Sequence, residues 1–252
     1  KGERKKKKKE DSDSRLKSIQ KMDDLIQEAR AYLQLKETNS QSFKHNLRME
    51  GMLPVIKGEI PLFIHANEVR QIEAAVYWSN RHNLKMILVG GKDSWRVTRL
   101  LKEKDIPVIY THVHSLPMRR FEKYDQPFIT PLQLFEAGVK FCISNSESPF
   151  QTPHIRNLPY YAAKASSYGL PHEEALRSIT LSPAEILSVA ENVGSLDIGK
   201  DATFFISDGD ILDVRTQVNM AFIQGRRVDL SDRHKMLYSK YRNKYQQKGL
   251  IK

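Results

Sequence analysis

The stretch Glu59-Ile-Pro-Leu-Phe-Ile-His-Ala-Asn67 predicts a strand that ends in a polar tip carrying His65 and Asn67. The apolar run 62–64 follows a proline and is typical of a strand that is covered on both faces. Residues 68–80 combine helix-forming residues with apolar positions at helical spacing, so a helix follows directly. In α/β barrels the chemistry takes place at the C-terminal ends of the strands, so His65 is the first candidate functional residue.

The same strand–helix alternation recurs downstream of this first unit. The expected strands are 61–67, 85–91, 107–114 and 140–146, and the expected helices are 68–80, 94–104, 131–137, 157–168 and 172–179. Four such units in sequence predict an α/β fold with a parallel sheet and right-handed crossovers. A closed barrel of this kind has eight units, so residues 59–190 correspond to half of one.

The segments that precede this region differ from it in composition. Residues 1–13 are highly charged and lack apolar anchors, so they are expected to be a disordered basic tail or linker. Residues 14–58 are expected to be a helical segment, with an apolar stripe that runs from Leu16 to Leu33. A shorter helix should follow within this segment, and Pro54 should kink it or confine it to one side.

The C-terminal part changes pattern again. Ser182 is expected to cap a short helix, with Pro183 at its first position. Residues 191–229 are punctuated by glycines and predict short strands joined by turns. Residues 230–252 predict a basic amphipathic helix.

Composition restricts the class of protein. The chain has 252 residues, of which 40% are hydrophobic, so a sizeable core can form. The net charge of +11 suggests affinity for polyanions, but the charge is concentrated near the two ends. Solvated tails are the simpler interpretation, and nucleic acid is not favoured as a partner. No stretch is long and apolar enough to span a bilayer, and the single cysteine, Cys142, predicts a buried, inert thiol.

A specific resemblance comes from four segments in fixed order. They are Thr180–Ala184, Val193–Ala202, Asp208–Asp210 and Val218–Val228. They follow the pattern T-x-x-P-A-x-x-L, V-G-S-L-x-x-G-K-D-A, D-G-D and a final strand ending in G-x-x-V, which resembles the C-terminal signature of the amidohydrolase superfamily. With matches at 58–66 and 137–139, the resemblance covers about residues 45–229. It is nearest to exported, imidazolonepropionase-like amidohydrolases.

This resemblance implies a fold and a chemistry. The fold would be a metal-dependent-hydrolase (β/α)8 TIM barrel with a small β-sandwich, of which this chain supplies barrel strands five to eight and part of the sandwich. The family hydrolyses amide or cyclic C–N bonds with a metal-activated water. The resemblance also suggests an exported or periplasmic protein, although this chain carries no signal peptide and begins with Lys.

Matched position by position, the metal site implied by the resemblance is degenerate. His65 stands at the first metal-binding histidine of strand five, and Asn67 at a frequent second one. Gly90 occupies the place of a metal-binding histidine at the end of strand six. Ser146 replaces the aspartate of strand eight that binds metal and moves the proton, and Glu147 is adjacent to it. A catalytic zinc site needs about three protein ligands, and this chain supplies one at the expected places.

Two compensations remain open. His112 and His114 would lie on one face of the third strand here, so they could form a three-histidine site with His65 for a divalent metal, zinc first. Alternatively, ligands could come from a complementary N-terminal barrel half, on the same precursor or on another chain. Half a barrel would leave an open sheet edge, which also predicts such a partner.

The remaining predictions concern the substrate and the reaction. A small-molecule substrate pocket is expected to include Asn67, Gly90, Gly91, Arg119, Arg120 and Asn145. Arg119 or Arg120 would clamp a substrate carboxylate. Two function classes stay open. The first is a hydrolase with an altered metal site that acts on amide or peptide-like C–N bonds. The second is a catalytically inactive relative that binds a ligand or partner in the same pocket.

Overall fold

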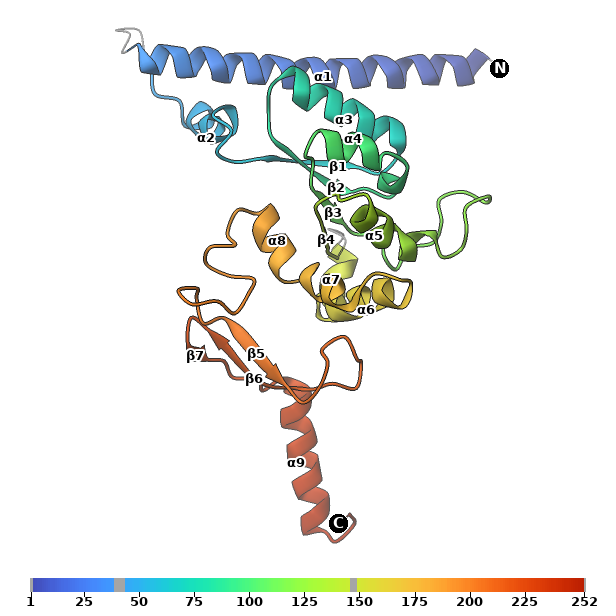
Figure 1. Ribbon diagram of the computed structural model, residues 1–252, viewed down its shortest axis with the longest axis vertical. Helices are drawn as coiled ribbons and strands as arrows, with labels where there is room; N and C mark the ends of the chain where they lie inside the picture. The colour runs from blue at the N-terminus through green and yellow to red at the C-terminus, as the bar shows by residue number, and fades with distance from the viewer. Residues whose placement is uncertain (1, 39–43, 146–148, 252) are drawn as a thin grey trace. The chain divides into compact units, whose positions relative to one another are not determined.

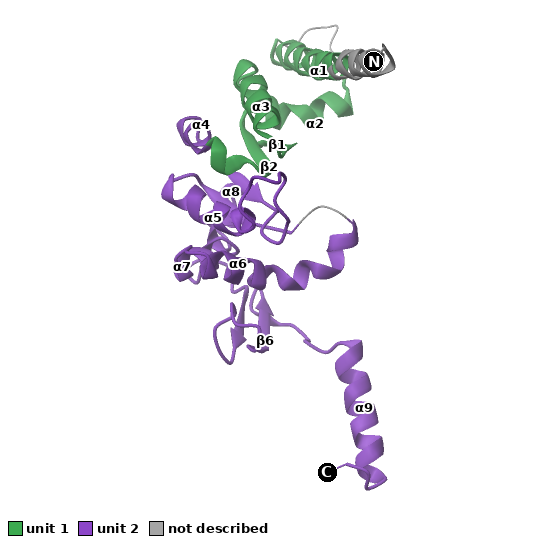
Figure 2. Ribbon diagram, turned by 90° about the vertical axis from the view of Figure 1, so that its right-hand side faces the viewer, with its two compact units in different colours: residues 1–97 green, residues 98–252 purple. Residues whose placement is uncertain are grey.

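The computed structural model of the protein describes residues 2–38, 44–145 and 149–251 (Figure 1). The chain divides into two compact units, Lys1–Val97 and Thr98–Lys252, here called unit 1 and unit 2 (Figure 2). Both units contain helices and parallel strand pairs, so the α/β class is confirmed. None of the helices in the described parts of the chain is long and apolar enough to cross a membrane.

Unit 1 is a helical hairpin followed by a βαβ unit. Its elements are α1 (Gly2–Glu37), α2 (Leu47–Ile56), β1 (Leu62–Ala66), α3 (Val69–Arg81), β2 (Met86–Gly90) and the 3₁₀ helix η1 (Ser94–Arg96). β1 and β2 are parallel, with Leu62 opposite Met86 and Ala66 opposite Gly90. Ile72 and Val76 are buried on α3, the crossover helix between these strands. The first predicted strand–helix unit is thus present.

The first helix differs from its prediction at its N-terminal end. α1 begins at Gly2, whereas residues 1–13 were expected to be a disordered tail. Lysine and glutamate have high helix propensity, so this charged run can extend a helix that its downstream part anchors. Part of the predicted apolar stripe is uncovered, because Leu16 is 63% exposed and Ile19 is 43% exposed.

The downstream half of α1 packs against α2. Ala29, Tyr32, Met49 and Leu53 form a buried apolar cluster between the two helices. Asn46 caps α2, because its side-chain oxygen accepts hydrogen bonds from the backbone N–H groups of the second and third helical residues. The helix continues past Pro54 to Ile56, and the proline carbonyl accepts the backbone N–H of Glu59 at 2.8 Å. Pro54 therefore lies in the last turn and does not end α2 at that residue.

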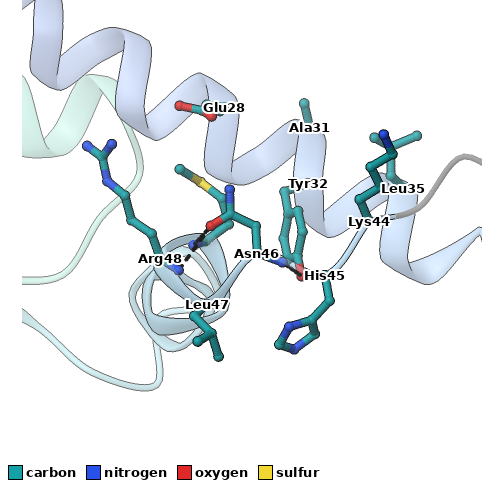
Figure 3. A pocket seen from close by; sticks show the side chains of 10 residues that line it. Glu28, Ala31, Tyr32, Leu35, Lys44, His45, Asn46, Leu47 and Arg48 are labelled. Carbon is teal, nitrogen blue, oxygen red and sulfur yellow. Dashed lines mark hydrogen bonds between the residues drawn. The ribbon is translucent and has the colours of Figure 1, made fainter.

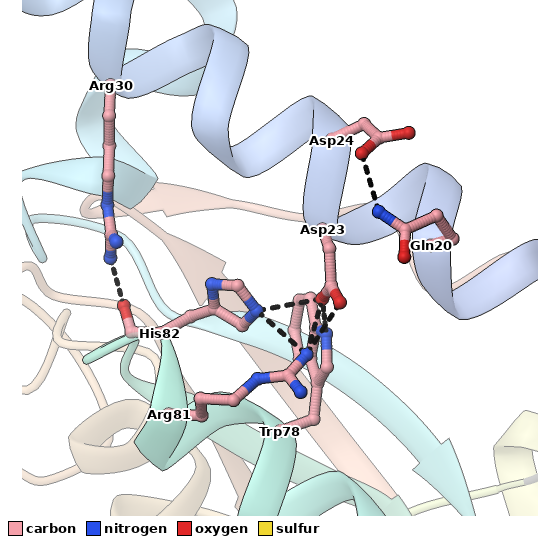
Figure 4. A network of polar contacts seen from close by, with 7 residues as sticks. All are labelled: Gln20, Asp23, Asp24, Arg30, Trp78, Arg81 and His82. Carbon is pink, nitrogen blue, oxygen red and sulfur yellow. Dashed lines mark hydrogen bonds and ion pairs between the residues drawn. The ribbon is translucent and has the colours of Figure 1, made fainter. Parts of the chain in front are cut away.

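A polar network joins α1 to the end of α3 (Figure 4). Asp23 accepts hydrogen bonds from Trp78 Nε1 at 2.7 Å and from Arg81 Nη2 at 2.6 Å. His82 Nε2 lies 2.8 Å from the same carboxylate, and Arg30 donates to the His82 carbonyl. The hydrogen bond from Trp78, followed by those from His82 and Arg81, holds the pKa of Asp23 below its usual value. This network and the apolar cluster fix the downstream half of α1 within unit 1.

The two strands of unit 1 are covered unequally. Every residue of β2 is buried, which is typical of a strand within a parallel sheet. β1 was expected to be covered on both faces, but Phe63 is 49% exposed and His65 is also exposed. These two residues alternate with Leu62 and Ile64, so one face of β1 is open to solvent within the described chain.

Unit 2 begins with a second parallel strand pair. Its first elements are α4 (Thr98–Glu103), β3 (Val108–Tyr110), α5 (Gln126–Glu136), β4 (Phe141–Ile143), the 3₁₀ helix η2 (Pro149–Asn157), α6 (Leu158–Ser167), α7 (His172–Arg177) and α8 (Leu181–Ile186). β3 and β4 are parallel, with Val108 opposite Phe141. Cys142 is buried as predicted, and burial raises the pKa of its thiol to about 12.

The second half of unit 2 is a small antiparallel sheet and a terminal helix. Its elements are β5 (Phe204–Ser207), β6 (Val218–Ile223), β7 (Arg226–Arg227) and α9 (Arg233–Gln247). The sheet order is β5-β6-β7. Thr180, and not Ser182, is the N-cap of α8, so Pro183 is its third helical residue. Closure of the strands into a barrel, and the sandwich, stay predictions.

Candidate functional site

In unit 1 the candidate residues lie in the loops that follow β1 and β2. The two loops are joined by backbone hydrogen bonds, from Gly91 N–H to the Ala66 carbonyl at 2.9 Å and from Asp93 N–H to the Asn67 carbonyl at 2.8 Å. Asn67 Oδ1 also accepts the backbone N–H of Lys92 at 3.4 Å. The strand ends of unit 1 therefore form one connected structure beside His65.

Gly90, the last residue of β2, is required by this arrangement. Its φ angle is +94°, a backbone conformation that favours glycine. A Cβ atom at this position would lie 2.6 Å from Asn67 Oδ1, closer than side-chain atoms pack. A metal-binding histidine therefore cannot replace Gly90 unless the backbone and Asn67 both move. The glycine found where the family resemblance implies a histidine has a structural cause.

Asp93 is a buried carboxylate that the sequence analysis missed. It is 1% exposed, and its Oδ2 accepts the backbone N–H of Val69 at 3.2 Å. Val69 is the first residue of α3, so Asp93 caps that helix from the neighbouring loop and complements its dipole. The glycine pair 90–91 immediately before Lys92 and Asp93 is a signal for a tight turn that could have drawn attention to this residue.

In unit 2 the predicted histidines lie beyond the strand that was expected to carry them. β3 ends at Tyr110, so His112 and His114 belong to the following turn, and strand alternation does not place them on one face. His112 Nδ1 lies 3.2 Å from Ser115 Oγ. The ring of His114 packs edge-on against Tyr161, with the ring centroids 4.5 Å apart.

His114 belongs to a group of polar and aromatic side chains after β3 and β4. The Tyr161 hydroxyl donates to Asn145 Oδ1 at 3.4 Å, and Asn145 in turn donates to the Gln151 carbonyl at 2.8 Å. Burial, followed by the nearby positive charge of Lys164, lowers the pKa of His114. The neutral form of this imidazole is therefore favoured over the protonated form.

The two arginines of the loop after β3 differ in their surroundings. Arg119 Nη1 lies 2.5 Å from Glu122 Oε1, and Arg120 is exposed. Burial raises the pKa of Glu122, but hydrogen bonds from the Arg119 side chain and from two backbone N–H groups outweigh it, so the pKa is lowered overall. The guanidinium of Arg119 is thus already engaged by a carboxylate of its own loop.

A further cavity of about 660 Å³ lies between α1 and α2, away from the strand ends (Figure 3). Tyr32 and Asn46 line it, and the Tyr32 hydroxyl donates to Glu50 at 2.7 Å. Lys36 Nζ also contacts Glu50, at 2.6 Å. Two side chains of α1 therefore satisfy this carboxylate of α2 and tie the two helices together.

The described residues do not fit a metal centre. Among the described residues, His65 is the one imidazole at the strand ends of unit 1. His112 and His114 of unit 2 lie after the end of β3. In neither unit do the described residues bring together three or more His, Cys, Asp or Glu side chains in a group that could hold a metal ion. Ser146 and Glu147, the residues at the family aspartate position, lie outside the described residues.

Comparison with known proteins agrees with this fold. Residues 133–228 match the amidohydrolase family. An imidazolonepropionase from Shewanella baltica is 31% identical over 98 residues, which are 38% of this chain and 23% of that protein. The chain thus spans less than a quarter of the length of this relative.

Solved structures are similar in fold. An amidohydrolase from Thermotoga maritima matches with a TM-score of 0.73 and 24% identity, over 84% of this chain and 55% of the other. A zinc-bound adenosine deaminase from Xanthomonas campestris matches with a TM-score of 0.51 and 16% identity, over 75% and 52%. This chain therefore shares the α/β fold of these proteins over the parts that match. The family match and the imidazolonepropionase relative confirm the resemblance of this chain to the amidohydrolase superfamily.

Proposed function

We propose that the chain is the C-terminal part of an amidohydrolase-type hydrolase that acts on C–N bonds of non-peptide or peptide-like amides. The observation that carries this proposal is the match of residues 133–228 to the amidohydrolase family, because this segment includes β4 and the whole sheet β5-β6-β7. The relative that is named an imidazolonepropionase supports a small-molecule substrate with a C–N bond.

The proposed substrate-binding residues follow the strands of each unit. In unit 1 they are Asn67, Gly90 and Gly91, and in unit 2 they are Arg119, Arg120 and Asn145. Asn67 and Asn145 are held by the hydrogen bonds described above, so both can present an amide in a fixed orientation. Arg120 is favoured over Arg119 as the group that binds a substrate carboxylate, since Arg119 already forms an ion pair with Glu122.

A divalent metal, with zinc as the first candidate, would take ligands from beyond the described residues of this chain. The partner that would supply them is the complementary N-terminal barrel half. Two observations support it: the chain spans 23% of the imidazolonepropionase, and one face of β1, including Phe63, is exposed. The zinc of the Xanthomonas deaminase supports the choice of metal.

Metal analysis of the purified chain tests this proposal. If the chain alone binds zinc, manganese or iron at less than about a tenth of an equivalent, metal-dependent hydrolysis by the chain alone is ruled out. If metal is present, His65→Ala is expected to release it, and His154→Ala, a change at an exposed histidine of η2, is expected to retain it. Hydrolysis of N-acyl amino acids and dipeptides should be lost together with the metal.

The second candidate function is a catalytically inactive relative that binds a ligand or partner. The observation that favours it is Gly90, because the positive φ and the contact with Asn67 exclude a side-chain ligand at this strand end. Saturable binding of a substrate amide without turnover, in the presence of added zinc, would support this candidate over the first.

A further inference from the structure

The terminal helix α9 is strongly basic and exposed. It begins after Asp232, whose side chain accepts the backbone N–H of Lys235 at 2.9 Å. Between Arg233 and Gln247 it contains five Lys and Arg residues and no Asp or Glu. Every residue from Ser231 to Ile251 is exposed. The helix therefore presents a surface that its own unit does not cover.

One side of α9 carries a continuous apolar stripe. Leu237, Tyr238, Tyr241 and Tyr245 recur at spacings of three and four residues, which places them on one face. Gly249, with φ +66°, then turns the chain, and Leu250 N–H donates to the Tyr245 carbonyl at 3.0 Å.

This turn brings the chain end back to the stripe. A groove of about 510 Å³, here called the α9 groove, is lined by Leu237, Tyr238, Tyr241, Arg242, Tyr245 and Ile251. Ile251 thus lines the groove together with α9, and it extends the apolar surface beyond the last turn of the helix.

We propose that the α9 groove docks on an anionic phospholipid surface, with the helix lying in the plane of the interface. Lys240, Arg242 and Lys244 flank the stripe, and cations in this position are attracted to acidic headgroups. Tyrosine suits the boundary because its ring is apolar and its hydroxyl is polar. A second copy of the same helix is a poor occupant, since it would bring the cations of two helices together.

The geometry of the tyrosine rings favours lipid over nucleic acid. Arg242 Cζ lies 5.9 Å from the Tyr238 ring centroid, and Lys244 Nζ lies 5.9 Å from that of Tyr241. The Tyr241 and Tyr245 rings stack on each other at 6.5 Å. Single-stranded nucleic acid binds aromatic side chains by stacking bases on ring faces, and here neighbouring side chains already use these faces.

Sedimentation of the full chain with phospholipid vesicles tests the proposal. The chain is expected to bind vesicles that contain about a third phosphatidylserine and to leave vesicles of phosphatidylcholine alone in solution. Binding should weaken at about 0.5 M salt, because salt screens the attraction between charges. Equal binding to both vesicles, or none to either, would overturn the proposal, as would tighter binding to a single-stranded oligonucleotide than to acidic vesicles.

Two sets of variants distinguish the contribution of the α9 groove to vesicle binding from the contribution of net charge. Lys240→Gln with Arg242→Gln and Lys244→Gln should weaken binding by roughly 100-fold, from the typical contribution of each cation near an acidic surface. The matched control, Lys5→Gln with Lys6→Gln and Lys7→Gln, removes the same charge from the start of the chain and should lose much less. Equal losses in the two variants would show that net charge, and not the α9 groove, drives binding.

A further variant tests the apolar part of the groove. Tyr241→Ser with Tyr245→Ser should remove the binding that persists at high salt, because this part depends on apolar burial. Both tyrosines are exposed, so the fold should be retained, and circular dichroism in solution checks this. Unchanged binding at high salt would exclude the apolar stripe from the docking surface.

Discussion

The loop after β2 and the loop after β3 follow parallel strands in the same way, yet they use their polar side chains differently. After β2, Asp93 is buried and bonded to the start of α3, and Asn67 accepts a backbone N–H from the same loop. After β3, Arg120 is exposed, and His114 is exposed except where its ring packs against Tyr161. The named polar side chains of the first loop bond to the backbone, whereas His114 and Arg120 of the second loop are accessible to a ligand. Substitutions in the first loop should therefore affect stability, and those in the second mainly ligand binding.

The largest effect is expected for Gly90→Ala. An alanine would have to adopt a positive φ and would place its Cβ 2.6 Å from Asn67 Oδ1. The free energy of unfolding should therefore fall by about 2–4 kcal/mol. Gly58→Ala is the control in the same unit, because its φ is also positive but the nearest atom to its Cβ, Lys85 Cε, is 3.7 Å away. That variant should lose about 1 kcal/mol. Urea unfolding of both variants measures the difference, and equal losses would show that the Asn67 contact costs nothing.

A smaller loss is expected for Asp93→Ala. The change removes the acceptor for the Val69 N–H and leaves a buried polar gap, so it should cost about 1–3 kcal/mol. Asp93→Asn keeps a side-chain oxygen and should lose less. Asp24→Ala, in the exposed part of α1, should stay within about 0.5 kcal/mol of the parent chain. If thermal unfolding shows equal losses for Asp93→Ala and Asp24→Ala, the loop after β2 is not the scaffold described here.

The sequence predicted the order of strands and helices because apolar runs and helical spacing are local properties. It could not predict where β3 ends. The pairing of β3 with β4 ends where β4 ends, at Ile143, which lies opposite Tyr110. The hydrogen bond from Ser144 N–H to the Tyr110 carbonyl, at 2.9 Å, follows this last pair. His112 and His114 therefore fall outside the strand, although their spacing is that of a strand face.

The exposure of β1 and the burial of Asp93 depend on neighbours in space. Nothing in the run 62–64 indicates that one face of its strand is open, because that depends on what lies beside it. Asp93 acquires its role from Val69, which precedes it by 24 residues. The family resemblance indicated the absent histidine at Gly90, and the structure adds the reason, which is the close approach of Asn67.

The smallest effect concerns the proton on His114, and it probes the second loop directly. Burial, followed by the charge of Lys164, lowers the pKa of this imidazole from its ordinary value of 6.5. The unfolded chain therefore binds this proton more readily than the folded chain does. The resulting contribution to stability is present above pH 6.5 and declines as the pH falls below that value. Titration by NMR should show that Tyr161→Ala, which uncovers the ring, raises the pKa of His114 more than Lys164→Met does. If Lys164→Met produced the larger rise, charge and not burial would be the main cause, and the environment of His114 would be more polar than its packing on Tyr161 indicates.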